Sequence, residues 1–414
     1  MISISLFFTG INLLGATQGL FLSLILAKLK RGNRQAIRIL AALVFVISIA
    51  LASTLLLYPA VYTAVPYLLR IADPMRLLFA PLIFLYVVSL TGGQVNRRSL
   101  FHFTPFVLYV LYLIPTFYVL PLAERISFIT EAQAGKWLSY NIYLVARALY
   151  FLLYLILSFR VLRRYSLRIQ ELFSSVERIN FSWLRNVLIA MTIWWFPQFI
   201  TTVSPFFGYL DLSFINRIIG LLGALWMYLL GYMAFLKADP FVNDTTSIEH
   251  ISATEAAQLA ARHEQYEKHE YEILHTQRHQ QPVTPLSQQS SEDEALLPHF
   301  QRFMETQKPY LDSELTLQKL SEQVDIPTYR LSQMMNTHLH QNFFDVVNRY
   351  RVEEWKRQII DAPAQMTIQE VAFQVGFNSK SSFNAAFKKH TGQTPSEYRT
   401  EYRLASSASS FQKA

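Results

Sequence analysis

The sequence predicts an all-helical protein in two parts. The first is a seven-span transmembrane helical bundle over residues 1–238, and the second is an all-helical C-terminal domain over residues 296–402, with two helix-turn-helix units joined by a long helix. Three observations support this fold class. Long apolar runs fill the first half, the number of Lys and Arg residues alternates between successive loops, and the C-terminal part repeats one pattern of apolar positions. Residues 239–295 are predicted to be a cytoplasmic linker, part helical and part disordered, and residues 403–414 a disordered tail.

The net charge of +8 is distributed unevenly along the 414 residues. Residues 1–238 carry 20 Lys and Arg against 6 Asp and Glu, residues 239–295 carry 3 against 11, and residues 296–414 carry 14 against 12, which gives +14, −8 and +2. The positive excess therefore lies in the apolar half, where basic loops orient membrane helices. The absence of cysteine excludes disulfides, Cys-ligated zinc and cysteine nucleophiles.

A membrane-spanning helix needs about 20 mostly apolar residues. Seven runs satisfy this requirement: residues 3–27, 39–62, 76–95, 101–121, 138–160, 184–207 and 214–236. The first run is long, has no basic residue before it and has no small-residue cleavage site after it. We therefore expect it to stay in the membrane rather than to be a cleaved signal peptide.

The loops differ sharply in positive charge. Those after the first, third and fifth runs contain 13 Lys and Arg residues when the run-end residues Arg160 and Arg185 are included, against 4, with Arg76, in the loops after the second, fourth and sixth. Because cytoplasmic loops are the ones enriched in Lys and Arg, the N-terminus is predicted to lie outside and the C-terminal domain in the cytoplasm. We therefore expect a multi-pass protein of the cytoplasmic (inner) membrane, with the lipid bilayer as a partner.

Two arginines within the apolar runs are candidate ligand-sensing residues. Arg147 lies about ten residues into the fifth run and Arg217 one turn into the seventh. A buried cation costs about 2.5 kcal/mol or more on insertion scales, so it pairs, lines a cavity or reaches the membrane interface. Reaching the interface explains Arg217, whereas for Arg147 a polar cavity with affinity for anions and a packing or interface role both stay open. The aromatic residues 194–196 are more typical of an interface anchor than of a ligand site.

The C-terminal domain begins with a helix, a short turn and a second helix. Leu317, Leu320 and Val324 recur at helical spacing, and the following Asp-Ile-Pro sequence interrupts the helix. A second helix is predicted to begin near Thr328. Helix, turn and helix in this order form the helix-turn-helix arrangement.

Residues 366–390 repeat this pattern. One apolar face precedes Gly376, which permits a left-handed turn, and Phe383 with Phe387 anchors the next helix. Residues 342–360, between the two units, have the pattern of a long amphipathic helix that holds them at a defined spacing.

Two such units held about 34 Å apart can place their second helices in successive major grooves of double-stranded DNA. The outward positions that we predict to contact DNA are Thr328, Tyr329, Arg330 and Gln333 in the first unit and Lys380, Ser381 and Asn384 in the second. The predicted phosphate contacts are Lys388, Lys389 and the hydroxyl of Thr394. Any polar helix face has this composition, so the duplication with matched turns is the feature that favours DNA binding.

These residues also carry a family resemblance. The segments KPYLDSEL, LTLQKLSEQV, NRYRVEEWK and VAFQVGFNSKSSFNAAFKKHTGQTPSEYR lie between about residues 300 and 399, a quarter of the chain. They resemble the DNA-binding domain of AraC/XylS-type bacterial transcription regulators. With its seven apolar runs the whole chain resembles the membrane-embedded subgroup, whose membrane part is taken to be a sensor. Three residues depart from the family pattern: Asp325 in a turn, Trp355 in the linking helix and Ala385 on the second recognition helix.

The resemblance implies sequence-specific DNA binding that is controlled by a signal sensed in or at the membrane. It also implies an unidentified ligand, and RNA polymerase and a second copy of the chain are further expected partners. The alternative is a transporter or channel-like membrane protein with a regulatory cytoplasmic domain. Against it, the predicted spans hold no carboxylate and no inverted repeat of broken helices. The sequence contains no zincin pattern, nucleophile elbow, phosphate loop or kinase signature, so we expect no enzyme activity, no metal and no cofactor.

Overall fold

The computed structural model describes residues 2–29, 33–57, 59–133, 138–176, 181–204, 222–223, 225, 286–361 and 366–402. Within these ranges the chain is helical and has no strand, apart from one isolated antiparallel bridge between Phe173 and Thr316. The predicted all-helical class is therefore confirmed for the described residues. The chain divides into two compact units. The first comprises Met1–Arg164 and Phe181–His250, and the second comprises Tyr165–Asn180 and Ile251–Ala414.

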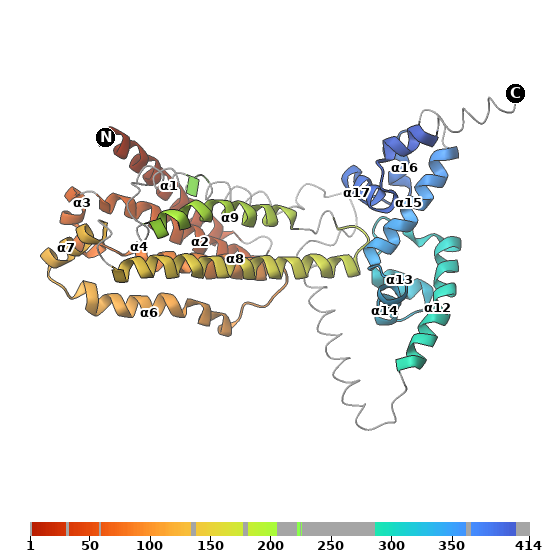
Figure 1. Ribbon diagram of the computed structural model, residues 1–414, viewed down its shortest axis with the longest axis horizontal. Helices are drawn as coiled ribbons and strands as arrows, with labels where there is room; N and C mark the ends of the chain where they lie inside the picture. Colours follow the sequence, from red (N-terminus) through yellow and green to blue (C-terminus); the bar gives the residue numbers. More distant parts are fainter. Residues whose placement is uncertain are drawn as a thin grey trace, which may run out of the picture. The chain divides into compact units, whose positions relative to one another are not determined.

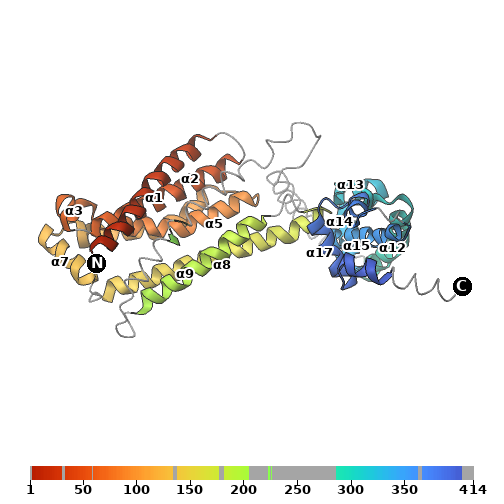
Figure 2. The same ribbon diagram turned by 90° about the horizontal axis from the view of Figure 1, so that it is seen from above.

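The first unit is a set of apolar helices. They include α1 (Ile2–Lys28), α2 (Arg34–Ala52), α5 (Phe79–Leu90), α6 (Thr104–Leu113), α8 (Leu138–Leu172) and α9 (Ser182–Val203). Helix α2 packs against both α1 and α5, and α8 and α9 run side by side in both views (Figures 1 and 2). The hydroxyl of Ser23 on α1 donates to the carbonyl of Ala41 on α2 at 2.9 Å. Such a bond satisfies a polar group between two apolar helices.

Short helices and helix irregularities complete the first unit. The short helices are α3 (Pro59–Ala64), α4 (Ala72–Met75) and α7 (Leu122–Gln133). Pro115 lies in a π-helical segment, Ile114–Tyr118, that follows α6, and Pro197 lies inside α9. Proline removes one backbone donor and its ring clashes with the preceding turn, which accounts for an irregular segment at Pro115.

Six helical segments of the described residues are long and apolar enough to cross a membrane. They are Thr9–Lys28, Arg34–Leu56, Ala72–Leu90, Arg97–Tyr118, Leu138–Leu172 and Ser182–Val203. Each overlaps one of the first six predicted runs, and nearly all of the seventh run, residues 214–236, lies outside the described residues. The third segment begins before the predicted run of residues 76–95 and so includes Asp73. Asp73 is buried and pairs with Arg70 and Arg76 at 2.9 Å each, which offsets the cost of burying its charge.

The second unit is built around one long helix, α15 (Phe343–Asp361). The other labelled helices are α12 (Leu286–Gln307), α13 (Leu317–Val324), α14 (Thr328–His338), α16 (Ile368–Gln374) and α17 (Lys380–Thr391). Helix α15 lies between α12–α14 on one side and α16 and α17 on the other (Figure 1). A last helix covers residues 395–402. Because α12 begins at Leu286, the end of the predicted flexible linker is helical.

Two hydrophobic cores flank α15. The first joins α12, α13, α14 and the start of α15 through residues that include Phe300, Leu320 and Met335. The second surrounds Trp355, which has no exposed surface and whose ring lies 5.2 Å from that of Phe383 and 5.0 Å from that of Phe387. The large residue at this position therefore fills the centre of the second core.

Candidate nucleic-acid interface

Side-chain caps and a left-handed turn define the helix pair α13–α14. The hydroxyl of Thr316 accepts a hydrogen bond from the amide of Lys319 at 3.2 Å, which caps α13. The helix ends at Asp325, whose φ of 56° is left-handed, a conformation that Asp tolerates better than most residues. The hydroxyl of Ser321 then donates to the carbonyl of Ile326 at 2.7 Å and accepts from the Thr328 hydroxyl at 3.1 Å. The turn is thereby held by the helix that precedes it.

The pair α16–α17 has the same organisation with different residues. Thr367 and Glu370 form a capping box at the start of α16, and the backbone amide of Thr367 donates to the Glu370 carboxylate at 2.7 Å. This hydrogen bond lowers the pKa of the Glu370 carboxyl. The turn contains Gly376 at φ 97°, where glycine has no steric penalty. Ser379 caps α17 by accepting from the amide of Ser382 at 3.1 Å.

Helices α14 and α17 each bury an apolar face and expose a polar one. On α17, Phe383, Ala386 and Phe387 are buried, as the spacing predicted for the two phenylalanines. Its exposed polar face includes four of the candidate contacts, Lys380, Ser381, Asn384 and Lys388, and also the neighbouring Ala385. On α14 the side chains of Tyr329 and Gln333 are exposed, whereas Thr328 and Arg330 are half-buried.

Several of the candidate contacts have hydrogen-bond partners within the second unit, among them Ser381, whose hydroxyl lies 3.1 Å from that of Ser379. The ammonium of Lys389 lies 2.6 Å from the carboxylate of Asp345 on α15. The hydroxyl of Thr394 accepts from the amide of Glu397 at 3.3 Å and so caps the last helix, while the hydroxyl of Thr328 is held by Ser321. These side chains already hold the unit together. Of the ten predicted contacts, those on the exposed face of α17 have the best access to a ligand.

A buried arginine connects the two helix pairs. Arg351 on α15 has no exposed surface. Its Nε donates to the carbonyl of Tyr310 at 2.7 Å, Nη2 donates to the carbonyl of Asp312 at 2.8 Å, and Nη1 donates to the Asn348 side chain at 3.3 Å. Its Cζ also lies 5.7 Å from the centre of the Phe377 ring, which follows the turn of the second pair. Arg351 therefore contacts groups on both sides of α15.

The remaining two donors of Arg351 bind the segment that follows α8. Nη1 donates to the carbonyl of Ser174 at 3.2 Å, and Nη2 donates to its hydroxyl at 3.2 Å. The same hydroxyl donates to the carbonyl of Leu315 at 2.7 Å, and Asn378 donates to the hydroxyl of Ser175 at 3.1 Å. Residues 173–176, which we call the α8 tail, thus contact the entrance to α13 and the turn before α17. The sequence analysis assigned this segment to the membrane part.

Sequence reasoning also missed Arg351, although a signal was present. Arg351 lies four residues after Val347 and four before Trp355, and both neighbours are fully buried. Residues four apart share one face of a helix, so the pattern puts a cation within the apolar stripe of α15. A charge at such a position needs a set of acceptors.

Gly376 lies against the same cluster. A Cβ atom at this position would be 2.6 Å from the carbonyl oxygen of Tyr310 and 2.9 Å from Nε of Arg351. The turn of the second helix pair therefore packs directly on the groups that Arg351 binds. Absence of a side chain is required here both by the close approach and by the positive φ.

A carboxylate beside this cluster is held in its charged form. Glu354 accepts from the Lys308 ammonium at 2.9 Å and from the Tyr310 hydroxyl at 3.3 Å. Burial alone would raise the pKa of Glu354, but hydrogen bonds from Lys308 and Gln358 outweigh it and lower that pKa. Burial and the Glu354 charge both raise the pKa of Tyr310.

Of the two candidate ligand-sensing arginines, only Arg147 is among the described residues. Arg147 lies on α8 and lines a cavity of the first unit, and Arg217 lies outside the described residues. The guanidinium of Arg147 lies 5.7 Å from the centre of the Tyr143 ring.

Comparisons with known proteins bear on the second unit. The family model described as Helix-turn-helix domain matches residues 320–401. Uncharacterised HTH-type transcriptional regulators of Staphylococcus aureus, from strains COL and MRSA252, are each 34% identical over 90 residues, which is 22% of this chain and 12% of theirs. The chain thus matches about an eighth of the length of these relatives.

Two solved structures are similar to part of the chain. One is a protein of unknown function from Listeria innocua, with 26% identity and a TM-score of 0.20, covering 28% of this chain and 97% of that one. The other is the C-terminal domain of AraT, a response regulator from Geobacillus stearothermophilus, with 25% identity and a TM-score of 0.22, covering 26% and 84%. By the family match, residues 320–401, about a fifth of the chain, are similar to the helix-turn-helix domain family.

Proposed function

We propose that the protein is a membrane-anchored transcription regulator that binds double-stranded DNA through two helix-turn-helix units, α13–α14 and α16–α17. The observation that carries this proposal is the polar face of α17. Lys380 and Asn384 are exposed on it, while Phe383 and Phe387 fasten the opposite face to the core. Lys can donate to guanine and Asn can pair with adenine in the major groove. Capping, turns and α15 orient the helix without using these side chains.

The first unit supports the membrane anchor. Its helices expose large apolar side chains, including Leu14, Phe21, Phe101 and Ile193, in numbers that a water-soluble surface does not carry. In a bilayer the same side chains contact lipid. The positive loops then favour an arrangement with the N-terminus outside and the DNA-binding domain in the cytoplasm.

We further propose that the α8 tail carries the signal. Helix α8 begins at Leu138 in the first unit, and its last residues, from Tyr165, belong to the second. Leu172 packs against the first core of the second unit, and Ser174 satisfies two N–H groups of Arg351. Withdrawal of the tail would leave those donors without partners and loosen the link between the two helix pairs. The spacing of the recognition helices would then depend on the state of α8.

Chromosome-wide crosslinking and immunoprecipitation of the full-length protein tests DNA binding. Discrete sites are expected for the wild type, and they should disappear with Lys380→Ala and Asn384→Ala, because each lost base contact costs about 1–3 kcal/mol. Lys356→Ala is the matched control, since it removes the same charge from α15. Sites that persist in the double variant would contradict the proposed role of α17.

Membrane orientation and the α8 tail need separate measurements. Reporter enzymes active only outside the membrane should be silent when fused after residue 402 and active when fused in the loop after the second apolar run. For the tail, Ser174→Ala removes two hydrogen bonds, and Ser175→Ala removes only an exposed one. Ser174→Ala should change the preferred spacing of half-sites in selected DNA, whereas Ser175→Ala should retain it. If both variants prefer the same half-site spacing, the α8 tail does not carry the signal.

A further inference from the structure

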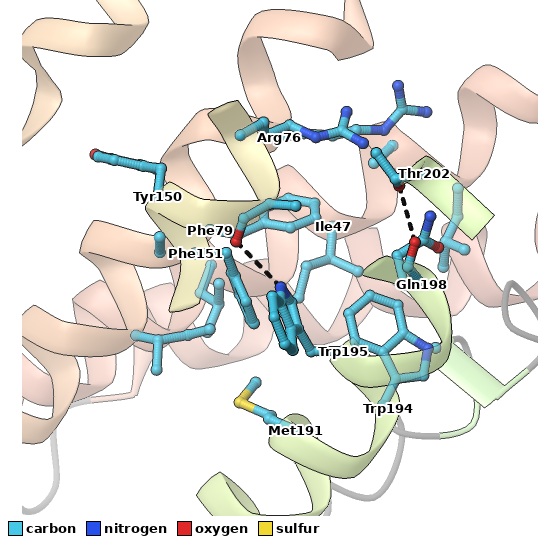
Figure 3. A pocket seen from close by; sticks show the side chains of 18 of the residues that line it. Ile47, Arg76, Phe79, Tyr150, Phe151, Met191, Trp194, Trp195, Gln198 and Thr202 are labelled. Carbon is cyan, nitrogen blue, oxygen red and sulfur yellow. Dashed lines mark hydrogen bonds between the residues drawn. The ribbon is translucent and has the colours of Figure 1, made fainter. Parts of the chain in front are cut away.

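The first unit encloses a cavity whose lining comes from five long helices. Its volume is about 430 Å³, within the roughly 300–1,000 Å³ that ligand pockets occupy. Side chains of α1, α2, α5, α8 and α9 line it, together with Arg76 just before α5. In Figure 3, Trp194 and Trp195 lie beside each other, Phe79 and Phe151 lie close to Trp195, and Arg76 lies across the space from Met191.

Most of this lining is apolar and well ordered. The indole nitrogen of Trp195 donates to the carbonyl of Ala148 at 3.1 Å, which ties α9 to α8 and fixes the ring (Figure 3). The Trp195 ring also stacks on Phe199 at 4.9 Å. Residues 194–196, which the sequence analysis interpreted as an interface anchor, have two different environments. Trp194 and Trp195 line the cavity, and Phe196 is exposed. Such walls favour an apolar ligand body.

Two arginines line the cavity, and their environments differ. Arg76 donates to the Asp73 carboxylate at 2.9 Å and to the Ser53 hydroxyl at 3.4 Å, and the same carboxylate also pairs with Arg70. Arg147 contacts the Tyr143 ring, and its Nη1 atom is buried without a hydrogen-bond partner. Among the described residues that line the cavity there is no Asp or Glu. The lining is therefore positively charged, because Asp73 is shared by two arginines and no described Asp or Glu lines the cavity beside Arg147.

The cavity also contains a second polar atom without a partner. Five buried side-chain atoms of the described residues lack a hydrogen bond, and two of them, Nη1 of Arg147 and Oδ1 of Asn12, belong to residues lining this one cavity. Buried polar groups in native proteins are nearly always satisfied, so a pair of exceptions in one cavity indicates a missing partner. A ligand head group with acceptor oxygens would accept from Nη1 of Arg147, and an adjacent donor group or water would donate to Oδ1 of Asn12.

From these observations we infer that the cavity binds an anionic amphiphile, with a carboxylate or phosphate head on Arg147 and an apolar body against Trp194 and Trp195. A carboxylate oxygen accepts a charge-assisted hydrogen bond from Nη1, which is about twice as strong as a neutral one. Arg76 instead pairs with Asp73, which holds the residues just before α5 in place. The use of this ligand as a signal rests on the proposed function, whereas its binding does not.

Direct binding of radiolabelled decanoate tests the inference. The full-length protein is reconstituted in phosphatidylcholine nanodiscs, with unlabelled decanoate or decanol as competitor. Decanoate should displace the label at least tenfold more effectively than decanol, which has the same chain without the charge. Arg147→Gln should weaken decanoate binding at least tenfold, Arg147→Lys should retain part of it, and Arg163→Gln on the exposed side of α8 should bind as the wild type does.

Equal displacement by decanol, or undiminished binding by Arg147→Gln, would overturn the inference. A second set of nanodiscs with phosphatidylglycerol distinguishes the sources of the anion. Loss of wild-type decanoate binding there identifies a bilayer lipid as the occupant, and unchanged binding identifies a soluble anion. The affinity of the same sample for a selected DNA site is measured in parallel. If decanoate binds at Arg147 but DNA affinity and half-site preference do not respond, the binding site stands and the sensing part of the proposed function fails.

Discussion

The two units of this chain place their apolar side chains in opposite ways. In the first unit, helices that are long and apolar enough to span a membrane expose side chains such as Leu14, Phe101 and Ile193, which are 71%, 78% and 68% accessible. In the second unit, Phe300, Leu320 and Trp355 have no accessible surface. Burial away from water explains the second arrangement, and the proposed membrane anchor would explain the first, because lipid would then contact the exposed side chains. Apolar side chains at helical spacing therefore form a buried core in the second unit, whereas in the first unit many of them lie on the outer surface.

The largest expected effect is on the buried cluster of the second unit. Arg351→Leu removes five hydrogen bonds and leaves the carbonyl of Tyr310 without this donor in the core, so it should destabilise this unit by about 3–5 kcal/mol. Thermal unfolding of the full-length protein, followed by hydrogen exchange in α15 and α17, measures it. Arg357→Leu, at an exposed position on the same helix, is the control. A loss below about 1 kcal/mol would show that the cluster is not a structural link.

The second largest difference is expected when an exposed apolar residue of each unit is replaced by Asp. Ile193→Asp should hinder membrane insertion by about 2.5–3.5 kcal/mol, because the carboxylate would contact hydrocarbon. Phe373→Asp, at a similarly exposed position of the second unit, should be nearly neutral. The membrane-inserted fraction of each variant gives the comparison. Normal insertion of Ile193→Asp would contradict a lipid-facing α9.

Gly376→Ala should have an intermediate effect of roughly 1–3 kcal/mol, since the residue has φ 97° and a methyl group would collide with the Tyr310 carbonyl. Gly392→Ala is a matched control, because its φ of 79° is equally left-handed but no atom lies within 4 Å of the added Cβ. Denaturant unfolding of both variants isolates the steric part. If both variants lose the same unfolding free energy, the whole effect comes from the left-handed backbone conformation and none from the collision with Tyr310.

The smallest expected effect is a pH dependence in the second unit. Burial lowers the pKa of His390 from its ordinary 6.5. The unfolded chain therefore binds a proton at pH values where the folded chain does not, so stability falls as the pH drops below about 6.5 towards the lower folded pKa. His390→Gln should flatten this part of the profile of unfolding free energy against pH. If the slope of unfolding free energy against pH is unchanged in His390→Gln, another group causes the pH dependence.

Local features of the second unit were predicted well because they depend on neighbours along the chain. The left-handed turn at Gly376 and the burial of Phe383 with Phe387 follow from spacing within one or two turns. The assignment of Lys389 and Thr394 to phosphate contacts did not foresee their bonds to Asp345 and Glu397, of which only the latter is local. The contacts with DNA themselves stay predictions.

By itself, the sequence determined the helices, most of their boundaries, the two turn-linked pairs and the apolar runs, because hydrophobic period and turn chemistry act over a few residues. Only the tertiary structure decided that Ser174 meets Arg351, 177 positions away, and that Arg147 faces a cavity lined by helices from both ends of the first unit. Periodicity shows which face of a helix is buried but not which distant segment covers it. That choice depends on how separate helices pack, and it placed both buried cations that carry the proposals made for this protein.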